Sequence, residues 1–140
     1  FTFAFVRNPW SWQVSLYHYM KQREYHRQHD VITSLDSFEQ YLDWRIDGHV
    51  RLQQEFLTDE AGNLIVDYVG RLERMNKDFQ VICDRIGLEA TLPHKNKSSH
   101  SDYRSYYSDR TRELVAQHYA ADIDRFGYSF DGIVQENINA

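Results

Sequence analysis

Hydrophobic residues form a short run at the start of the chain and then recur at helical spacing. Residues 1–6 are almost wholly apolar and include three phenylalanines, which is typical of a strand buried on both faces in a parallel sheet. Asn8 and Pro9 follow as a helix start, since Asn is a favoured N-cap and Pro fits the first helical position. From Trp10 the apolar positions share one stripe and predict a helix to about His29. A strand followed by a helix indicates half of a βαβ unit.

Further along, the pattern predicts one more strand and three more helices. Asp36 with Glu39 three residues later matches a capping box and predicts a helix that ends near Gly48. The β-rich residues 65–72 predict a second buried strand that ends near Gly70. The remaining elements are a tight turn over 57–64, a helix over 75–86, a loop over 93–102 and a last helix over 115–126.

Composition narrows the class of protein. The chain has 140 residues, 41% of them hydrophobic and 26% charged, which is a single-domain length and excludes a disordered chain. No run approaches the roughly 18 apolar residues of a membrane span. The net charge of −5 argues against a nucleic-acid partner bound by bulk charge. The single cysteine, Cys83, excludes an intrachain disulfide and a cysteine-based zinc site.

Charge is distributed unevenly along the chain. Residues 36–67 have a net charge of −6, whereas residues 94–112 have a net charge of +3. A basic loop in an acidic chain is a candidate anion site, although solvated surface charge is the commoner explanation. Both interpretations stay open at this point.

The residue between the first strand and the first helix is the best candidate for binding chemistry. Ligands of open α/β sheets bind outside the carboxyl ends of the strands, where a helix N-terminus adds free N–H groups. Arg7 stands at that corner, and an arginine can bind a phosphate with two hydrogen bonds. Ser15 lies off the apolar stripe and offers a further donor. The alternative is that Arg7 pairs with a carboxylate and that Ser15 is an ordinary helix serine.

Histidines are weaker candidates. His26 and His29 lie three residues apart near Glu24, but no further ligand has the spacing of a zinc site. His18 and His49 are candidate bases, although a single helical histidine is more often a surface or packing residue.

The motif at this corner resembles that of a known family. Arg7-Asn8-Pro9 followed by Ser15 and Tyr17 resembles the 3′-phosphate-binding motif of PAPS-dependent sulfotransferases, most closely the carbohydrate-type, family 2-like group. In that family the arginine and serine bind the 3′-phosphate of PAPS, which implies this role for Arg7 and Ser15. The resemblance also covers residues 56–59, 67–73, 92–98 and 103–130.

The later segments extend the implied site. The resemblance places Arg71 near the adenine, and it places Lys97 and Ser98 in a loop that closes over the 3′-phosphate. Two positions depart from the family pattern. Trp12 replaces an arginine found in many members, and Leu72 replaces an aromatic residue that packs near the purine.

The resemblance implies a fold and a reaction. The fold is α/β, with a nucleotide-kinase-like (P-loop NTPase-type) parallel sheet, flanking helices and a high helix content. The reaction transfers a sulfuryl group from PAPS to a hydroxyl, as of a carbohydrate, with no metal. The sequence does not identify the compartment, which would be a cytoplasm for a bacterial protein and a Golgi lumen, with an upstream membrane anchor, for a eukaryotic one. The resemblance identifies neither the oligomeric state nor the general base.

One motif of the family has no counterpart here. The sequence has no glycine-rich loop followed by Lys-Ser or Lys-Thr, and the family's phosphosulfate-binding loop precedes the first strand. We therefore expect residues 1–140 to be the carboxyl-terminal portion of one sulfotransferase domain, N-terminally incomplete and inactive alone. The alternative is a non-enzymatic helical interaction module or an inactive remnant. A nucleotide kinase is disfavoured because no kinase lid pattern is present.

Overall fold

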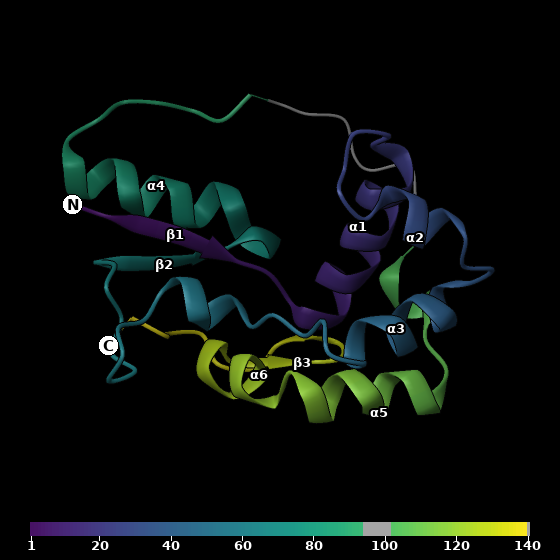
Figure 1. The fold of residues 1–140 in the computed structure, drawn as a ribbon. Helices are drawn as coiled ribbons and strands as arrows, with labels where there is room; N and C mark the ends of the chain where they lie inside the picture. The colour runs from purple at the N-terminus through teal and green to yellow at the C-terminus, as the bar shows by residue number, and fades with distance from the viewer. Residues whose placement is uncertain (94–101, 140) are drawn as a thin grey trace.

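Two parallel strands form a small sheet, and one helix packs on it. The structure is a computed structural model that describes residues 1–93 and 102–139 (Figure 1). Strand β1 (Phe3–Val6) pairs with strand β2 (Tyr68–Arg71) in parallel, with Phe3 opposite Tyr68 and Val6 opposite Arg71. The carboxyl ends of both strands therefore lie side by side at the same end of the sheet. Helix α4 (Met75–Ile86) follows β2 and packs against it.

Helices make up most of the rest of the described chain. Helix α4 lies on one side of the sheet, and α6 with β3 lies on the other (Figure 1). No helix among the described residues is both long and apolar enough to cross a membrane. The remaining elements are α1 (Pro9–Gln22), α2 (His29–Thr33), α3 (Phe38–Ile46), α5 (Asp109–His118), α6 (Ala120–Phe126), β3 (Tyr128–Ser129), β4 (Gly132–Ile133) and the 3₁₀ helices η1 (Gln53–Phe56), η2 (Leu72–Arg74) and η3 (Tyr103–Tyr106).

Two clusters of buried side chains form the core. The larger cluster joins α1, α3 and α5, with Val14, Tyr41 and Val115 fully buried. The smaller cluster joins the sheet to α6, with Val69 and Phe126 at its centre. Because β1 leads directly into α1, the end of β1 lies where the two clusters meet.

The structure confirms the helix-rich α/β class and the predicted strand–helix–strand order. Helix α1 ends at Gln22 instead of near His29, because Tyr25, the next apolar position after Met20, is fully exposed and nothing packs against it. The predicted last helix is broken at Tyr119, which separates α5 from α6.

Other boundaries also differ from the predictions. Ser37 caps α3, by accepting a hydrogen bond from the N–H of Gln40, in place of the predicted Asp36. The predicted strand over 65–72 is shortened to β2, and the tail contains the unpredicted hairpin β3–β4. The prediction of a strand buried on both faces was wrong for β1. Its Phe3 is 45% exposed, because within residues 1–93 and 102–139 the sheet has only two strands.

Candidate anion-binding site at the end of strand β1

Asn8 joins three segments at the corner between β1 and α1. Its side-chain oxygen accepts a hydrogen bond from the N–H of Trp10 at 3.0 Å, as expected of an N-cap. Its side-chain N–H donates to the carbonyl of Ser129, and its backbone N–H donates to the Glu73 carboxylate at 2.6 Å. Tyr128 also donates to Glu73. The start of α1 is therefore fixed to both η2 and β3.

Arg7 places a guanidinium group at this corner, and its terminal nitrogens are available for a ligand. Its Nε donates to the hydroxyl of Ser11 at 2.9 Å, and neither terminal nitrogen has a hydrogen-bond or carboxylate partner within residues 1–93 and 102–139. The alternative that Arg7 pairs with a carboxylate is therefore not observed. Partial burial lowers the pKa of Arg7, and the nearby Glu73 and Tyr128 oppose that shift. The guanidinium stays charged, since even a lowered arginine pKa lies far above neutral pH.

Two serines follow Arg7 along one side of α1. Ser11 is buried, and its hydroxyl accepts the hydrogen bond from Arg7. Ser15 lies one turn further along the same side, is partly buried, and makes no hydrogen bond through its hydroxyl to the described residues. Sequence reasoning found Ser15 but missed Ser11, although the spacing of four residues from Arg7 was a usable signal. Arg7, Ser11 and Ser15 thus bring several donors to one side of the corner.

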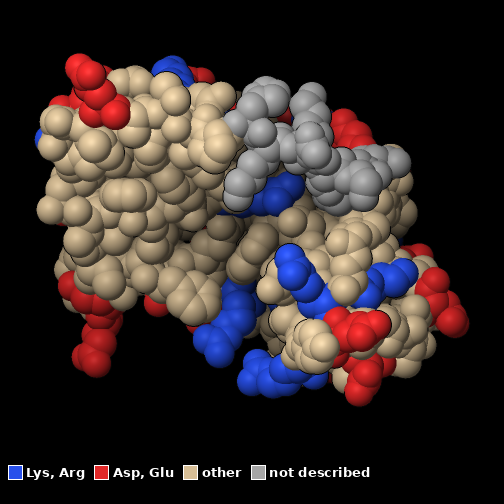
Figure 2. Space-filling model, turned by 90° about the horizontal axis from the view of Figure 1, so that it is seen from above, with Lys and Arg blue, Asp and Glu red and all other residues tan. Residues whose placement is uncertain are grey.

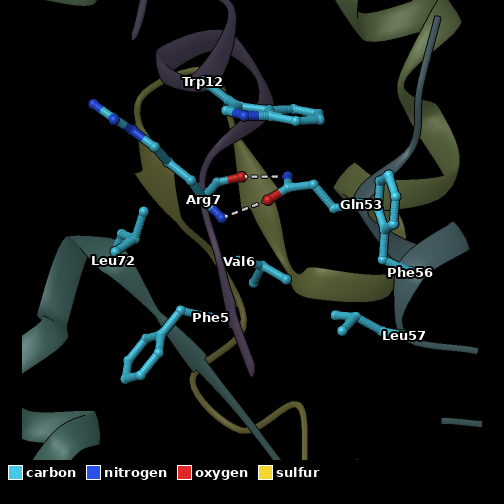
Figure 3. A pocket seen from close by; sticks show the side chains of 8 residues that line it. All are labelled: Phe5, Val6, Arg7, Trp12, Gln53, Phe56, Leu57 and Leu72. Atoms are coloured by element: carbon cyan, nitrogen blue, oxygen red, sulfur yellow. Dashed lines mark hydrogen bonds between the residues drawn. The ribbon is translucent and has the colours of Figure 1, made fainter. Parts of the chain in front are cut away.

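A hollow opens beside Arg7 at the carboxyl end of β1. Its volume is about 270 Å³ and its walls are mainly apolar (Figure 3). Figure 3 shows the side chain of Arg7 pointing away from Gln53, which lies on the opposite side of the Arg7 backbone. The two positions that depart from the family pattern, Trp12 and Leu72, both line this hollow. The other lining residues are Phe5, Val6, Gln53, Phe56 and Leu57.

Comparison with known proteins identifies the family. The model of the Sulfotransferase family matches residues 1–129. The chain belongs to this family. Family membership indicates sulfuryl transfer as the type of reaction, and sulfotransferases of this family generally use PAPS as the donor. No curated protein and no solved structure matches the chain.

Arg71 has a structural position in this sulfotransferase-family chain. Its side chain is fully buried. Nε and Nη2 donate to the carbonyl of Phe126, Nη1 donates to that of Glu136 at 3.1 Å, and Nη2 also donates to that of Gln135. This placement argues against the implied contact between Arg71 and the adenine, because all three nitrogens already donate to carbonyls and no surface of the side chain is exposed.

The basic segment is only partly available for binding an anion. Arg110 pairs with Glu39 and Asp43, and Arg104 pairs with Asp102, so both cations are compensated. Lys97 and Ser98 lie outside the described residues. Figure 2 nevertheless shows Lys and Arg side chains gathered around a central hollow on the face seen from above.

The histidines contact other side chains or the backbone. Nε2 of His18 lies 2.8 Å from the hydroxyl of Tyr106, and His49 stacks on Trp44 with the ring centroids 4.3 Å apart. Neither histidine lines the hollow beside Arg7. Within the described part of the chain, no group of three or more His, Cys, Asp or Glu side chains forms a candidate metal site.

Leu72 provides a test of whether the nucleotide enters the hollow. Leu72→Asp is expected to weaken binding of adenosine 3′,5′-bisphosphate severalfold. The new carboxylate would repel the phosphates of the ligand, and two like charges at close range in a partly exposed site repel each other by about 1 kcal/mol or more. Leu72→Asn is the matched control, because asparagine has the shape of aspartate without its charge. Leu72→Tyr is expected to preserve or improve the affinity for the bisphosphate. Titration calorimetry measures all three. Equal affinities for the Asp and Asn variants would mean that Leu72 is remote from the phosphates.

Proposed function

We propose that this chain is part of a PAPS-dependent sulfotransferase in which Arg7 and Ser15 bind the 3′-phosphate of the donor. The observation that supports this most directly is that both terminal nitrogens of Arg7 have no partner in residues 1–93 and 102–139. Neither nitrogen is a buried atom, so a phosphate can reach both and accept two charge-assisted hydrogen bonds from them. The hydroxyl of Ser15, which makes no hydrogen bond to the described residues, adds a neutral donor for the same anion.

The proposal extends to the domain and to the acceptor. Residues 1–140 are the carboxyl-terminal portion of one domain of the P-loop NTPase type, whose parallel sheet includes β1 and β2. The acceptor is a hydroxyl group, and a carbohydrate would supply it, because the sequence resembles the carbohydrate-type group of sulfotransferases. Lys97 and Ser98 remain proposed ligands of the 3′-phosphate on the same resemblance, whereas Arg71 does not.

The residues of this chain supply binding and charge compensation. In sulfuryl transfer the acceptor oxygen bonds to the sulfur of PAPS while the bond between sulfur and the 5′-phosphate oxygen breaks. Adenosine 3′,5′-bisphosphate leaves, and a base removes the proton of the acceptor hydroxyl. Arg7 would hold the 3′-phosphate through two parallel N–H donors, which fixes the nucleotide as well as neutralising charge. A fixed nucleotide in turn orients the transferring group toward the acceptor.

Arg7→Ala tests the proposal by its effect on ligand affinity. The affinity for adenosine 3′,5′-bisphosphate is expected to fall by about 1.5–3 kcal/mol, the contribution of a hydrogen bond to a charged group. This corresponds to a factor on the order of ten to a hundred in the dissociation constant. Ser15→Ala should cost about 1 kcal/mol, because its donor is neutral. Titration calorimetry gives these values directly.

A second ligand and a second arginine serve as controls. Adenosine 5′-monophosphate lacks the 3′-phosphate, so Arg7→Ala should leave its affinity unchanged. Arg23→Ala removes an exposed arginine at the other end of α1, and the affinity for the bisphosphate should not change. If the chain does not bind the bisphosphate, or if Arg7→Ala binds it as tightly as the parent chain does, the proposed function is wrong. A non-enzymatic interaction module would then be the better interpretation.

A further inference from the structure

Gln53 continues the hydrogen bonding of β1 by one residue. The backbone N–H of Arg7 donates to Oε1 of Gln53 at 2.9 Å, and Nε2 of Gln53 donates to the carbonyl of Arg7 at 2.7 Å (Figure 3). A side-chain amide here imitates a neighbouring strand, since one group satisfies both the donor and the acceptor of a peptide unit. The backbone of Arg7 is therefore fixed although β1 ends at Val6.

A buried carboxylate holds Gln53 in turn. Asp122 of α6 is fully buried, and it accepts hydrogen bonds from the backbone N–H groups of Gln53 at 2.6 Å and Gln54 at 3.1 Å. The first turn of η1 thus receives its cap from a different part of the chain. Burying a carboxylate is costly unless its oxygens are hydrogen-bonded, so this contact fixes α6 and η1 relative to each other.

The two contacts form one chain of support that ends at Arg7. Asp122 holds the backbone of Gln53, the side chain of Gln53 holds the backbone of Arg7, and Ser11 holds Nε of Arg7. If the arginine side chain can rotate before binding, its rotatable bonds become ordered when the phosphate binds. The lost conformational entropy lowers the affinity. Support on both sides of Arg7 reduces that cost and keeps the terminal nitrogens in one place.

We infer that Gln53 is a positioning residue for Arg7, held in place by Asp122, and that it sets the affinity of the site for the 3′-phosphate without supplying the charge. This inference rests on the proposed function of Arg7. Gln53 acts on the ligand only through Arg7. Removing the amide therefore loosens the Arg7 backbone and moves the guanidinium away from its binding geometry, while the cation itself remains.

Gln53→Met tests the inference, with Gln54→Met as the matched control. Methionine keeps the length of the side chain and removes both hydrogen bonds to Arg7. Gln54 lies in the same 3₁₀ helix and its side chain accepts a hydrogen bond from Arg125 at 2.9 Å, so the control also removes a structural bond but none to Arg7. Small displacements of a binding group have large effects, and we expect about a tenfold loss of affinity for adenosine 3′,5′-bisphosphate in Gln53→Met alone.

Coupling to Arg7 separates positioning from a merely structural role. In an Arg7→Ala background, Gln53→Met should change the affinity by about twofold or less, since its effect is transmitted through the missing side chain. An equal loss in both backgrounds would overturn the inference, because Gln53 would then act on the ligand directly or on the fold as a whole. No loss in the parent background would also overturn it. Thermal unfolding of each variant verifies that all of them are folded.

A measurement without ligand keeps the inference independent of the proposed function. In the NMR spectrum of the free chain, the Nε–H signal and the backbone amide signal of Arg7 should shift in Gln53→Met and stay unchanged in Gln54→Met. Unchanged Arg7 signals in Gln53→Met would overturn the positioning role. If the signals shift but the parent chain does not bind the bisphosphate, the positioning of Arg7 stands and the proposed function fails.

Discussion

Replacing Arg71 with alanine is expected to lower the free energy of unfolding by about 3–5 kcal/mol, because each carbonyl that loses its donor costs about 1–3 kcal/mol and the cavity left by the side chain adds to this loss. The guanidinium is fully buried and donates to the carbonyls of Phe126, Gln135 and Glu136. Removing it takes away the guanidinium donors of the Phe126 and Gln135 carbonyls and opens a cavity beside β2, whereas the Glu136 carbonyl keeps a hydrogen bond from Arg74. Urea unfolding followed by the fluorescence of the three tryptophans measures the loss.

Two further substitutions make this prediction specific. Arg71→Lys keeps the charge but loses the fork that reaches three carbonyls, so its loss should be smaller than that of alanine. Arg110→Ala removes an exposed arginine that pairs with Glu39 and Asp43, and surface ion pairs contribute only about 0–1 kcal/mol. If Arg71→Ala unfolds at the same urea concentration as Arg110→Ala, the buried contacts of Arg71 do not stabilise this region.

The start of the site was predictable because its signals are local. An apolar run, an Asn-Pro helix start and an arginine between them lie within ten residues, and each acts through its immediate neighbours. The structure accordingly has β1, the Asn8 cap and the start of α1 where the sequence predicts them. The positions of Arg7 and Ser15 follow from these three elements.

The role of Arg71 was not predictable from the sequence. The partners of its guanidinium are backbone carbonyls, and the nearest of them in sequence is 55 residues away. Because every residue has a carbonyl, the residue types do not reveal which carbonyls accept a hydrogen bond. The resemblance to the family suggested a contact with the adenine, and only the three-dimensional arrangement shows the side chain directed into the core. Gln53 was missed for the same reason, because its partner is the backbone of Arg7.

Two predicted helix boundaries were wrong, one at the start of α3 and one at Tyr119. Asp36 and Ser37 are both favoured N-caps, and the structure uses Ser37 while Gln40 reaches back to the N–H of Asp36. The apolar stripe over 115–126 looked continuous, yet the backbone leaves the helix at Tyr119, whose side chain is fully buried. Periodicity reports which face is buried, and it is insensitive to a break that keeps that face in place.

Gly127→Ala is the substitution expected to destabilise the carboxyl-terminal part of the chain most among the helix-ending glycines. Gly127 ends α6 with φ at +67°, a conformation in which a side chain costs about 1–2 kcal/mol. A methyl group there would also lie 2.6 Å from Cβ of Gln135 and 3.0 Å from Nη2 of Arg71. Overpacking of this kind costs typically about 1–3 kcal/mol, so the two effects together predict a loss of about 2–5 kcal/mol.

Gly87 separates the two effects within the same molecule. It ends α4 with φ at +70°, nearly the same as at Gly127, but a methyl group there would meet no atom within 4 Å among the described residues. Gly87→Ala should therefore lose only the conformational part, about 1–2 kcal/mol. The difference between the two losses, measured by urea unfolding, isolates the contact with Gln135 and Arg71. Equal losses at the two glycines would mean that the segment around Gln135 moves aside easily, and the large effect predicted for Arg71→Ala would then have to be revised downward as well.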